Sequence, residues 1–235
     1  MKIVTWNCNM AFRKKAEMIL KDHPDIVIVQ ECEHPEKLKF KSGIPNPTDV
    51  LWFGHNKNKG LGIFSYSDYK FSRLDYNPNF KLVVPVSVYN QTNQLTLYAI
   101  WANNPEDREG RYVTQVWKAI NHYDRQLSNA NVILIGDFNS NTIWDKPRRE
   151  GNHSTVVKFL EAKGIRSVYH HHFKQQQGKE KHPTFHLYRQ KEKPYHIDYC
   201  FVSAGLLDKL HSVKVGSFTT WSKLSDHHPL FIRFK

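Results

Sequence analysis

Two short polar segments of the sequence contain residue types that could do acid–base chemistry. Residues 136–139 read Gly-Asp-Phe-Asn and follow the apolar run 131–135, so Asp137 and an amide stand at the end of a predicted buried strand. Residues 225–227 read Ser-Asp-His and precede a second strand-like stretch at 230–234. A carboxylate and an imidazole placed where strands end can bind charged ligands and transfer protons, so the two segments suggest a catalytic site.

The elements that must position these groups alternate between strand and helix patterns. A strand at 2–6, a helix at 12–21 and a strand at 25–30 form a β-α-β opening, and further helices are expected at 110–127 and 154–163. Residues 173–183 have the composition of a mobile surface loop. The other expected strands lie at 60–65, 82–89, 94–101, 131–137, 196–203, 212–218 and 230–234.

No linker divides the chain, so residues 1–235 are expected to form one α/β domain. Strands predominate with a few helices between them, which favours two packed sheets with helices on the outer faces, although the pattern alone leaves other α/β arrangements open.

The composition favours a polyanionic partner and a reducing compartment. The net charge is +12 and the isoelectric point is near 9.5, which favours nucleic acid over an anionic membrane surface, although excess lysine could serve only solubility. Cys8, Cys32 and Cys200 are odd in number and lack metal-ligand spacing, so neither a disulfide framework nor a thiolate zinc site is expected. The N-terminal residues do not form a signal peptide and no stretch could span a bilayer, so we expect a cytoplasmic protein.

Five polar segments in a fixed order carry a stronger signal than any one of them. They read Trp-Asn-Cys-Asn at 6–9, Gln-Glu at 30–31, Gly-Asp-Phe-Asn at 136–139, His-Ile-Asp-Tyr at 196–199 and Ser-Asp-His at 225–227. This order resembles the endonuclease/exonuclease/phosphatase superfamily over nearly the whole chain, and the exonuclease III and abasic-site endonuclease branch in particular. Two smaller matches agree: a glycine-containing strand at 59–65 and Thr184-Phe185 ahead of the segment that contains Asp198. The resemblance implies a four-layer α/β sandwich of two mixed sheets flanked by helices.

The resemblance also implies a metal site. Glu31 matches the principal metal ligand, and Asn7, Asn9 and Asp226 would complete or surround that site. Carboxylate oxygens suit Mg²⁺, which keeps several waters, and Mn²⁺ is the expected substitute. Asn9 stands where the abasic-site branch has an aspartate, so metal affinity is expected to be weaker.

Four further residues match the catalytic groups of the family. Asp137 would orient or deprotonate the attacking water, and Asn139 would hold a phosphoryl oxygen. His227 would bind phosphate or act as acid or base, while Asp198 would bond its other ring nitrogen and favour the charged form. His228 and the run of histidines at 170–172 are not expected to take part.

The resemblance also suggests residues that could bind the substrate. Phe185, Tyr195 and Ile197 stand where the abasic-site branch forms its sugar pocket, although ordinary packing would also account for them. Trp101 replaces a tyrosine or histidine of the nuclease branches, and its indole can donate but cannot mimic a phenolate. The remaining candidates are Asn103 and a basic group that could follow a phosphate backbone: Arg13, Lys14, Lys15, Arg108, Arg111, Lys146, Arg148 and Arg149.

We therefore predict a divalent-metal-dependent phosphodiesterase, most simply a monomeric DNA nuclease. One alternative is a phosphatase or phospholipase of the same superfamily, with an inositol phosphate or a sphingolipid as substrate. The other is a catalytically silent nucleic-acid-binding protein.

Overall fold

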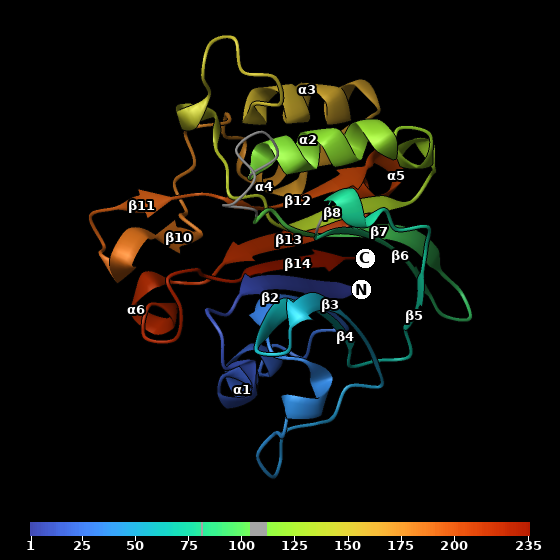
Figure 1. Cartoon of the computed structure of the whole chain (residues 1–235), viewed down its shortest axis with the longest axis vertical. Helices are drawn as coiled ribbons and strands as arrows, with labels where there is room; N and C mark the ends of the chain where they lie inside the picture. Colours follow the sequence, from blue (N-terminus) through green and yellow to red (C-terminus); the bar gives the residue numbers. More distant parts are fainter. Residues whose placement is uncertain (81, 104–111) are drawn as a thin grey trace.

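Two mixed β-sheets pack face to face between helices in the computed structural model, which describes residues 1–80, 82–103 and 112–235 (Figure 1). Within these residues each sheet has six strands. This arrangement confirms the fold class predicted from the sequence.

The first sheet has the strand order β13-β14-β1-β2-β4-β3. β1 is parallel to β2 and antiparallel to β14, so the two ends of the chain pair in the middle of one sheet. Because of this pairing, the residues that follow β1 and those that precede β14 lie at the same edge. The bounds are β1 (Lys2–Asn7), β2 (Ile26–Cys32), β3 (Asp49–Asn56), β4 (Lys59–Ser65), β13 (Leu210–Val215) and β14 (Leu230–Phe234).

The second sheet has the order β5-β6-β7-β8-β12-β9. β7 is parallel to β8, and β12 is antiparallel to β8, which places Asp198 opposite Asp137 in the register. A short hairpin of β10 (Phe185–His186) and β11 (Pro194–Tyr195) stands beside this sheet. The bounds are β5 (Lys70–Arg73), β6 (Val83–Tyr89), β7 (Gln94–Trp101), β8 (Val132–Asp137), β9 (Ile165–Ser167) and β12 (Asp198–Ser203).

Helices cover the outer faces of both sheets, with α2 and α3 over the second sheet and α1 on the first (Figure 1). The α-helices are α1 (Ala16–Leu20), α2 (Val113–His122), α3 (His153–Ala162), α4 (Val168–Phe173), α5 (Ala204–Leu207) and α6 (Phe218–Trp221). Short 3₁₀ helices are η1 (Phe12–Lys14), η2 (Pro35–Lys37), η3 (Pro78–Phe80), η4 (Gln126–Ser128), η5 (Thr142–Trp144) and η6 (Leu187–Arg189).

Three apolar clusters hold the layers together. Ile28 and Ile133 belong to the cluster between the two sheets. Ile120 of α2 packs with Leu134 beneath the helices of the second sheet, and Ile19 of α1 packs under the first sheet. Each of these side chains is at most 1% exposed, and full burial of such a side chain stabilises a fold by about 1.5–3 kcal/mol. Three clusters between four layers therefore fix the two sheets relative to each other.

The differences from the sequence prediction lie mainly in short elements and element ends: β9, β10, β11 and the helices α4, α5 and α6 were not predicted, and the strand predicted at 212–218 ends at Val215. The predicted helix at 12–21 is divided into η1 and α1, and the described part of the predicted helix at 110–127 consists of α2 and η4. β3 and β5 were not predicted, because both are edge strands that lack a clear alternation of buried and exposed side chains. The histidine run at 170–172 lies in α4 rather than in a strand or loop.

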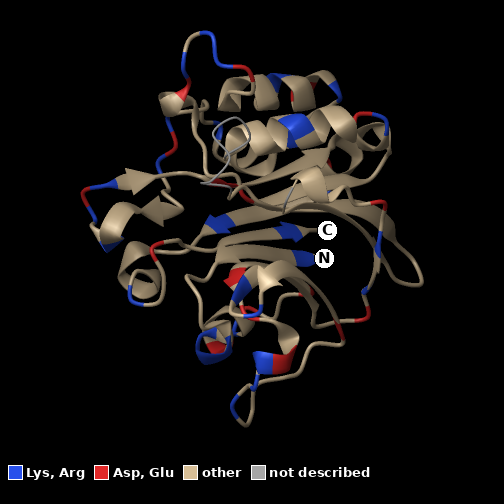
Figure 2. Ribbon diagram, viewed as in Figure 1, with Lys and Arg blue, Asp and Glu red and all other residues tan. Residues whose placement is uncertain are grey.

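Charge is spread over the molecule rather than gathered in one block. Figure 2 shows Lys and Arg on helices and loops of both halves. Among the described residues, no helix is both long and apolar enough to cross a membrane.

Candidate active site

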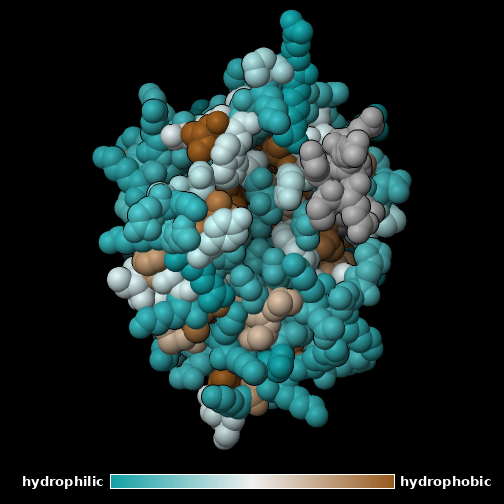
Figure 3. Space-filling model, turned by 60° about the vertical axis from the view of Figure 1, so that its left-hand side comes forward, coloured by the Kyte–Doolittle hydropathy of each residue, from teal (hydrophilic) through white to brown (hydrophobic). Residues whose placement is uncertain are grey.

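The site forms where strand ends of the two sheets meet. Asn7 ends β1 in the first sheet, and Asp137 ends β8 in the second. The side-chain amide of Asn7 donates to Asp137 Oδ2 at 3.2 Å, so one hydrogen bond joins the two sheets. In Figure 3 the corresponding side of the molecule is turned forward, and its surface is mostly hydrophilic with separate hydrophobic side chains. The sequence placed these two residues 130 positions apart, and only the packing of the sheets brings them together.

Asp137, Asp198 and His227 form a buried cluster of two acids and an imidazole. His227 Nδ1 lies 2.9 Å from Asp198 Oδ2, and His227 Nε2 lies 3.9 Å from Asp137 Oδ2. A carboxylate can only accept, so Nδ1 carries a proton and donates to Asp198. All three residues are at most 5% exposed. The imidazole is therefore oriented by one acid and faces the other.

Backbone contacts hold His227 at the end of the first sheet. Its amide donates to Ser225 Oγ at 3.0 Å, and that hydroxyl donates to the carbonyl of Asn7 at 2.8 Å. The indole of Trp6 donates to the carbonyl of His227 at 3.0 Å. Ser225 and Trp6 thus position the histidine. Sequence reasoning gave neither of them this role, since a serine and a tryptophan in such segments carry no signal of their own.

The turn after β8 has a backbone conformation that suits glycine and asparagine. Gly136 has φ 144°, and a Cβ there would lie 1.9 Å from the carbonyl oxygen of Ile100. Asn139 has φ 49°, in the left-handed region that asparagine tolerates. Its backbone amide donates to Asp137 Oδ1 at 2.8 Å and its side chain to Oδ2 at 3.3 Å. The Gly-Asp-Phe-Asn segment therefore fixes the catalytic candidate Asp137, and the amide of Asn139 is directed at that carboxylate.

The pKa values of Asp137 and His227 are both raised, for different reasons. Burial, opposed by the charge of His227 and reinforced by Asp198, raises the pKa of Asp137 to about 7. Burial alone would lower the pKa of His227, but the carboxylates of Asp198, Asp137 and Asp226 outweigh it and raise the pKa to about 10. Between these values the pair consists of a carboxylate and an imidazolium.

Glu31 lies beside this cluster on a strand irregularity. The pairing of β2 with β4 shifts register between Gln30 and Cys32, and Glu31 between them has φ 60°. Its Oε1 lies 3.5 Å from the amide of Asn7 and 3.3 Å from Lys59 Nζ. The Glu31 side chain therefore points toward the site instead of following the alternating side-chain directions of the strand. Lys59 was not singled out as a site residue, because a lysine at the start of a strand looks like ordinary surface.

Asn9 and Asp226 stand next to Glu31 and Asn7. The backbone amide of Asn9 donates to Asn7 Oδ1 at 3.1 Å, and its side chain donates to Asp226 Oδ1 at 2.8 Å. Burial would raise the pKa of Asp226, but His227 and the bond from Asn9 lower it below its ordinary value. Lys15 donates to the carbonyl of Asn9 at 3.1 Å and helps to hold this loop.

The donor set fits a divalent cation. Ligand atoms of Asp137, Asp198 and His227 lie within 4.8 Å of one another, and because the imidazolium of His227 has no free lone pair, the carboxylate oxygens are the available donors. Asp198 Oδ1 is buried without a hydrogen-bond partner among the described residues, which leaves a lone pair for a ligand. Glu31 and Asp226 add carboxylate oxygens at the same edge, and oxygen donors suit Mg²⁺ and related hard cations.

The expected substrate-binding residues lie in different surroundings in the structure. Trp101 is 4% exposed and lies opposite Asp137 in the register, with Lys59 Nζ 5.3 Å from its ring centroid. Its ring therefore lies beneath Lys59 and exposes little surface, and its contact with substrate stays a prediction. Asn103 follows β7 and is half-buried, while Arg108 and Arg111 lie outside the described residues.

An aromatic group borders the imidazole. Phe185 packs on His227 with ring centroids 4.7 Å apart, and Tyr195 lies 6.3 Å from Phe185. Trp144 extends this group, with its ring 4.9 Å from Tyr195. Ile197 is 2% exposed and belongs to the interior rather than to a sugar pocket. Of the three residues expected to form that pocket, two are thus available at the surface.

The loop at 173–183 is anchored to the molecule by polar contacts. Glu180 Oε1 lies 3.0 Å from His170 Nε2 and accepts from the backbone amide of Gly178, while its Oε2 accepts from Asn141. Burial would raise the pKa of Glu180, but the bond from His170 and the backbone amides lower it to about 2. His170 is thus held by a polar contact with Glu180.

The chain matches one known protein family over most of its length. A family model described as Endonuclease/Exonuclease/phosphatase family matches residues 4–227. No curated protein matches the sequence. Divalent-metal dependence is general to the matched family.

Solved structures resemble the whole chain. A structure of a 3′-5′ exonuclease, NExo from Neisseria meningitidis, has a TM-score of 0.70 and 20% identity, with 100% of both chains covered. A second structure, described as a 3′ phosphatase NExo from Neisseria bound to a product DNA hairpin, has a TM-score of 0.71 and 19% identity, covering 100% of this chain and 99% of the other. An AP endonuclease from Archaeoglobus fulgidus has a TM-score of 0.69 and 18% identity, with 100% and 99% covered. These likenesses show the shared fold.

Proposed function

The chain belongs to the Endonuclease/Exonuclease/phosphatase family, and we propose that it is a nuclease that hydrolyses phosphodiester bonds of DNA with the help of a divalent metal ion. The observation that carries the proposal is the buried Asp137–His227–Asp198 cluster, joined through Asn7 to Glu31. A buried acid and imidazole whose pKa values are shifted, at the meeting edge of two sheets, is the usual mark of a catalytic centre.

Asp137 is the group that accepts a proton from the attacking water. Its raised pKa of about 7 makes it a far better base near neutral pH than an ordinary carboxylate. Asn7 and Asn139 donate to its oxygens and hold it in one orientation. A water bound to this carboxylate would be aligned with a phosphorus atom bound in front of the cluster.

His227 is the group that stabilises charge on the phosphoryl oxygens. Its pKa of about 10 keeps it cationic at neutral pH, and the bond to Asp198 directs Nε2 toward the bound phosphate. Asn139 would turn its amide to a phosphoryl oxygen when substrate is bound. Each of these groups acts by position and charge, which is what phosphoryl chemistry requires of a protein.

Glu31, Asn7 and Asp226, with Asn9 beside them, are the residues that we propose hold Mg²⁺, or Mn²⁺ in its place. A divalent ion there would neutralise phosphoryl charge and stabilise the leaving oxygen. The ion pair between Lys59 and Glu31 shows that this carboxylate already attracts a cation.

DNA is the substrate class that we favour. The net charge of +12 suits a polyanion, and the aromatic group beside His227 can contact sugars and bases. Among the proteins of the same fold, one is described as bound to a product DNA hairpin and another as an AP endonuclease. Because the former is described as a 3′ phosphatase, a terminal phosphomonoester is the second substrate to test.

We further propose that residues 1–235 act as one catalytic domain and as a monomer, because both sheets of a single chain supply the site. Three buried free cysteines suit a reducing cytoplasm.

The test is cleavage of end-labelled plain duplex, single-stranded, abasic-site, 3′-phosphate and matched RNA substrates with and without chelator. Replacing Asp137 by Asn should lower kcat by about 100-fold to 10,000-fold while DNA affinity is retained. The matched control is Asp208→Asn, an exposed acid after α5, which should change neither quantity. Cleavage that survives in Asp137→Asn, or that is absent from every substrate with intact folding, would contradict the proposal.

A further inference from the structure

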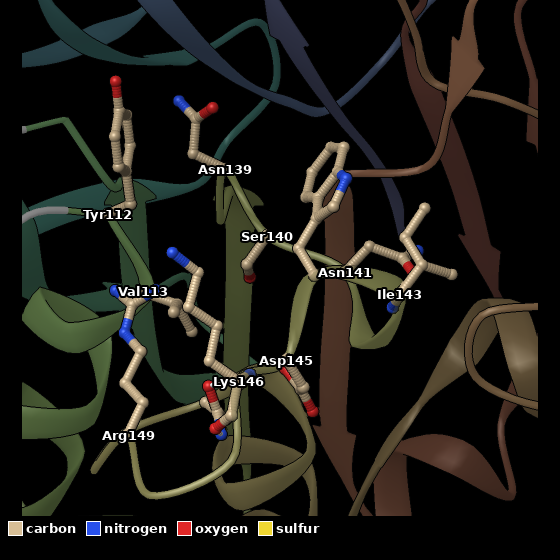
Figure 4. Close-up of a pocket in the computed structure, with 11 residues that line it drawn as sticks. Tyr112, Val113, Asn139, Ser140, Asn141, Ile143, Asp145, Lys146 and Arg149 are labelled. Carbon is tan, nitrogen blue, oxygen red and sulfur yellow. Dashed lines mark hydrogen bonds between the residues drawn. The ribbon is translucent and has the colours of Figure 1, made fainter.

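A pocket beside the catalytic cluster is lined mostly by side chains that have no role in the proposed reaction steps. Its volume is about 580 Å³, which is within the usual range for a small-molecule or nucleotide site of about 300–1,000 Å³. Asn139 forms one of its edges and contacts Asp137, so the pocket opens next to the reacting centre. Figure 4 shows the side chain of Lys146 extending from the far side toward Tyr112 and Asn139. We call this cavity the Trp144 pocket.

Exposed apolar side chains form part of the lining of the Trp144 pocket. Tyr112 is 37%, Trp144 42% and Ile143 55% exposed, and these are three of the seven large hydrophobic side chains that are exposed in the described part of the chain. Single exposed hydrophobic side chains are common, but a group of them at one cavity is typical of a binding site. Aromatic rings of this kind stack on nucleic-acid bases without regard to sequence.

The charge of the Trp144 pocket is positive. Lys146 and Arg149 line it, and the Lys146 ammonium has no hydrogen-bonding or ionic partner among the described residues. Asp145 also lines the pocket, but its two oxygens accept from the backbone amides of His153 and Ser154 at 2.9 and 3.0 Å at the start of α3. Asp145 is thus bonded to the N-terminus of α3, and the Lys146 ammonium is free to bind an anion.

The frame of the pocket is rigid. Asn141 accepts from the amide of Ile143 at 3.1 Å and donates to Tyr199 and to the carbonyl of His196. Asn152 accepts from the backbone amide of Lys146 and donates to its carbonyl. Such bonds form the pocket before a ligand arrives, which lowers the entropy cost of binding.

From these observations we infer that the Trp144 pocket binds one base-bearing nucleotide of the cut strand, next to the scissile phosphate. Its base stacks on the aromatic wall, and its phosphate meets Lys146. A sugar without a base would leave the apolar wall uncovered, so the protein prefers an intact nucleotide at that position. This inference rests on the proposed nuclease function and names how its site selects substrate.

The test uses oligonucleotides with one cleavable phosphodiester, the other linkages being phosphorothioates. A single abasic residue is moved along the positions on both sides of that bond. At one flanking position the loss of the base should lower kcat/KM roughly 10-fold to 100-fold, as expected for one stacked base. In Trp144→Ala this penalty should disappear, and in Trp144→Phe it should persist. Lys146→Ala should lower kcat/KM for all of the oligonucleotides about equally. Lys158→Ala, on the exposed side of α3, should change none of these values.

A separate readout does not require turnover. The Kd of each oligonucleotide is measured by fluorescence anisotropy in the presence of chelator, for wild type and Trp144→Ala. If no oligonucleotide is cleaved, the proposed nuclease function fails, but a base-dependent Kd that Trp144→Ala abolishes would still support the pocket. If neither kcat/KM nor Kd depends on a base at any position, or if the dependence persists in Trp144→Ala, the inference is overturned.

Discussion

Replacing Asp198 by Asn should remove a pH-dependent part of the stability of this protein. The Asp198 carboxylate lies 2.9 Å from His227 Nδ1, and both residues are nearly inaccessible to water. Burial lowers the pKa of His227, but Asp198 and its neighbours raise it from an ordinary 6.5 to about 10. At about 1.4 kcal/mol per pH unit this rise corresponds to about 5 kcal/mol. Because Asp137 and Asp226 also act on the imidazole, we assign about half, roughly 2–3 kcal/mol, to Asp198.

The direction of the pKa shift of His227 determines how the stabilisation depends on pH. The folded state holds the proton of His227 more tightly than the unfolded chain does, so the stabilisation is complete below about pH 6.5 and is lost as the pH rises through about 10. The difference in the free energy of unfolding between wild type and Asp198→Asn should therefore be largest near the lower pH and should shrink toward the upper one.

Urea unfolding at several pH values between these limits measures the difference directly, and an NMR titration of the imidazole C–H signals follows the pKa of His227 in both proteins. The control is Asp208→Asn, whose free energy of unfolding should follow that of wild type at every pH. A difference between wild type and Asp198→Asn that is the same at all pH values would falsify the conclusion that Asp198 keeps His227 protonated.

Three other outcomes follow from the geometry. Gly136→Ala would place a Cβ 1.9 Å from the carbonyl oxygen of Ile100 at a positive φ, so we expect a loss of at least about 3 kcal/mol in the free energy of unfolding. The control Gly205→Ala has no atom within 4 Å of its new Cβ and should change the free energy of unfolding little. Equal losses in the two variants would contradict the steric argument. Lys59→Gln removes a cation 3.3 Å from Glu31, so Mn²⁺ should bind about 2- to 10-fold more tightly, as measured by calorimetric titration. Unchanged or weaker Mn²⁺ binding would show that this lysine does not compete with the metal. Mg²⁺ at millimolar concentration should raise the Tm of wild type but not of Glu31→Gln, and an equal rise in both would place the ion elsewhere.

The sequence alone determined the elements and the chemical groups of the site. An apolar run followed by Gly-Asp-Phe-Asn predicts a strand end with an acid, because buried strands need apolar residues and the turn after them needs residues that tolerate unusual backbone angles. Asp137 could be found in this way, whereas Asp198 and His227 were identified by the order of the polar segments and their resemblance to the family. The periodicity and composition of the segments also distinguished strands from helices, because strand and helix patterns are local.

Only the tertiary structure decided which of these groups meet. The bond between Asn7 and Asp137 crosses from one sheet to the other, and no local pattern encodes the distance between sheets. Trp101 was selected by its match to a tyrosine or histidine of the family, and only the packing of the sheets decides that its side chain is nearly buried. Lys59 looked like surface, yet the register shift in β2 turns Glu31 toward it. The raised pKa values of Asp137 and His227 have the same origin, because burial and charge neighbours exist only after the two sheets have packed together.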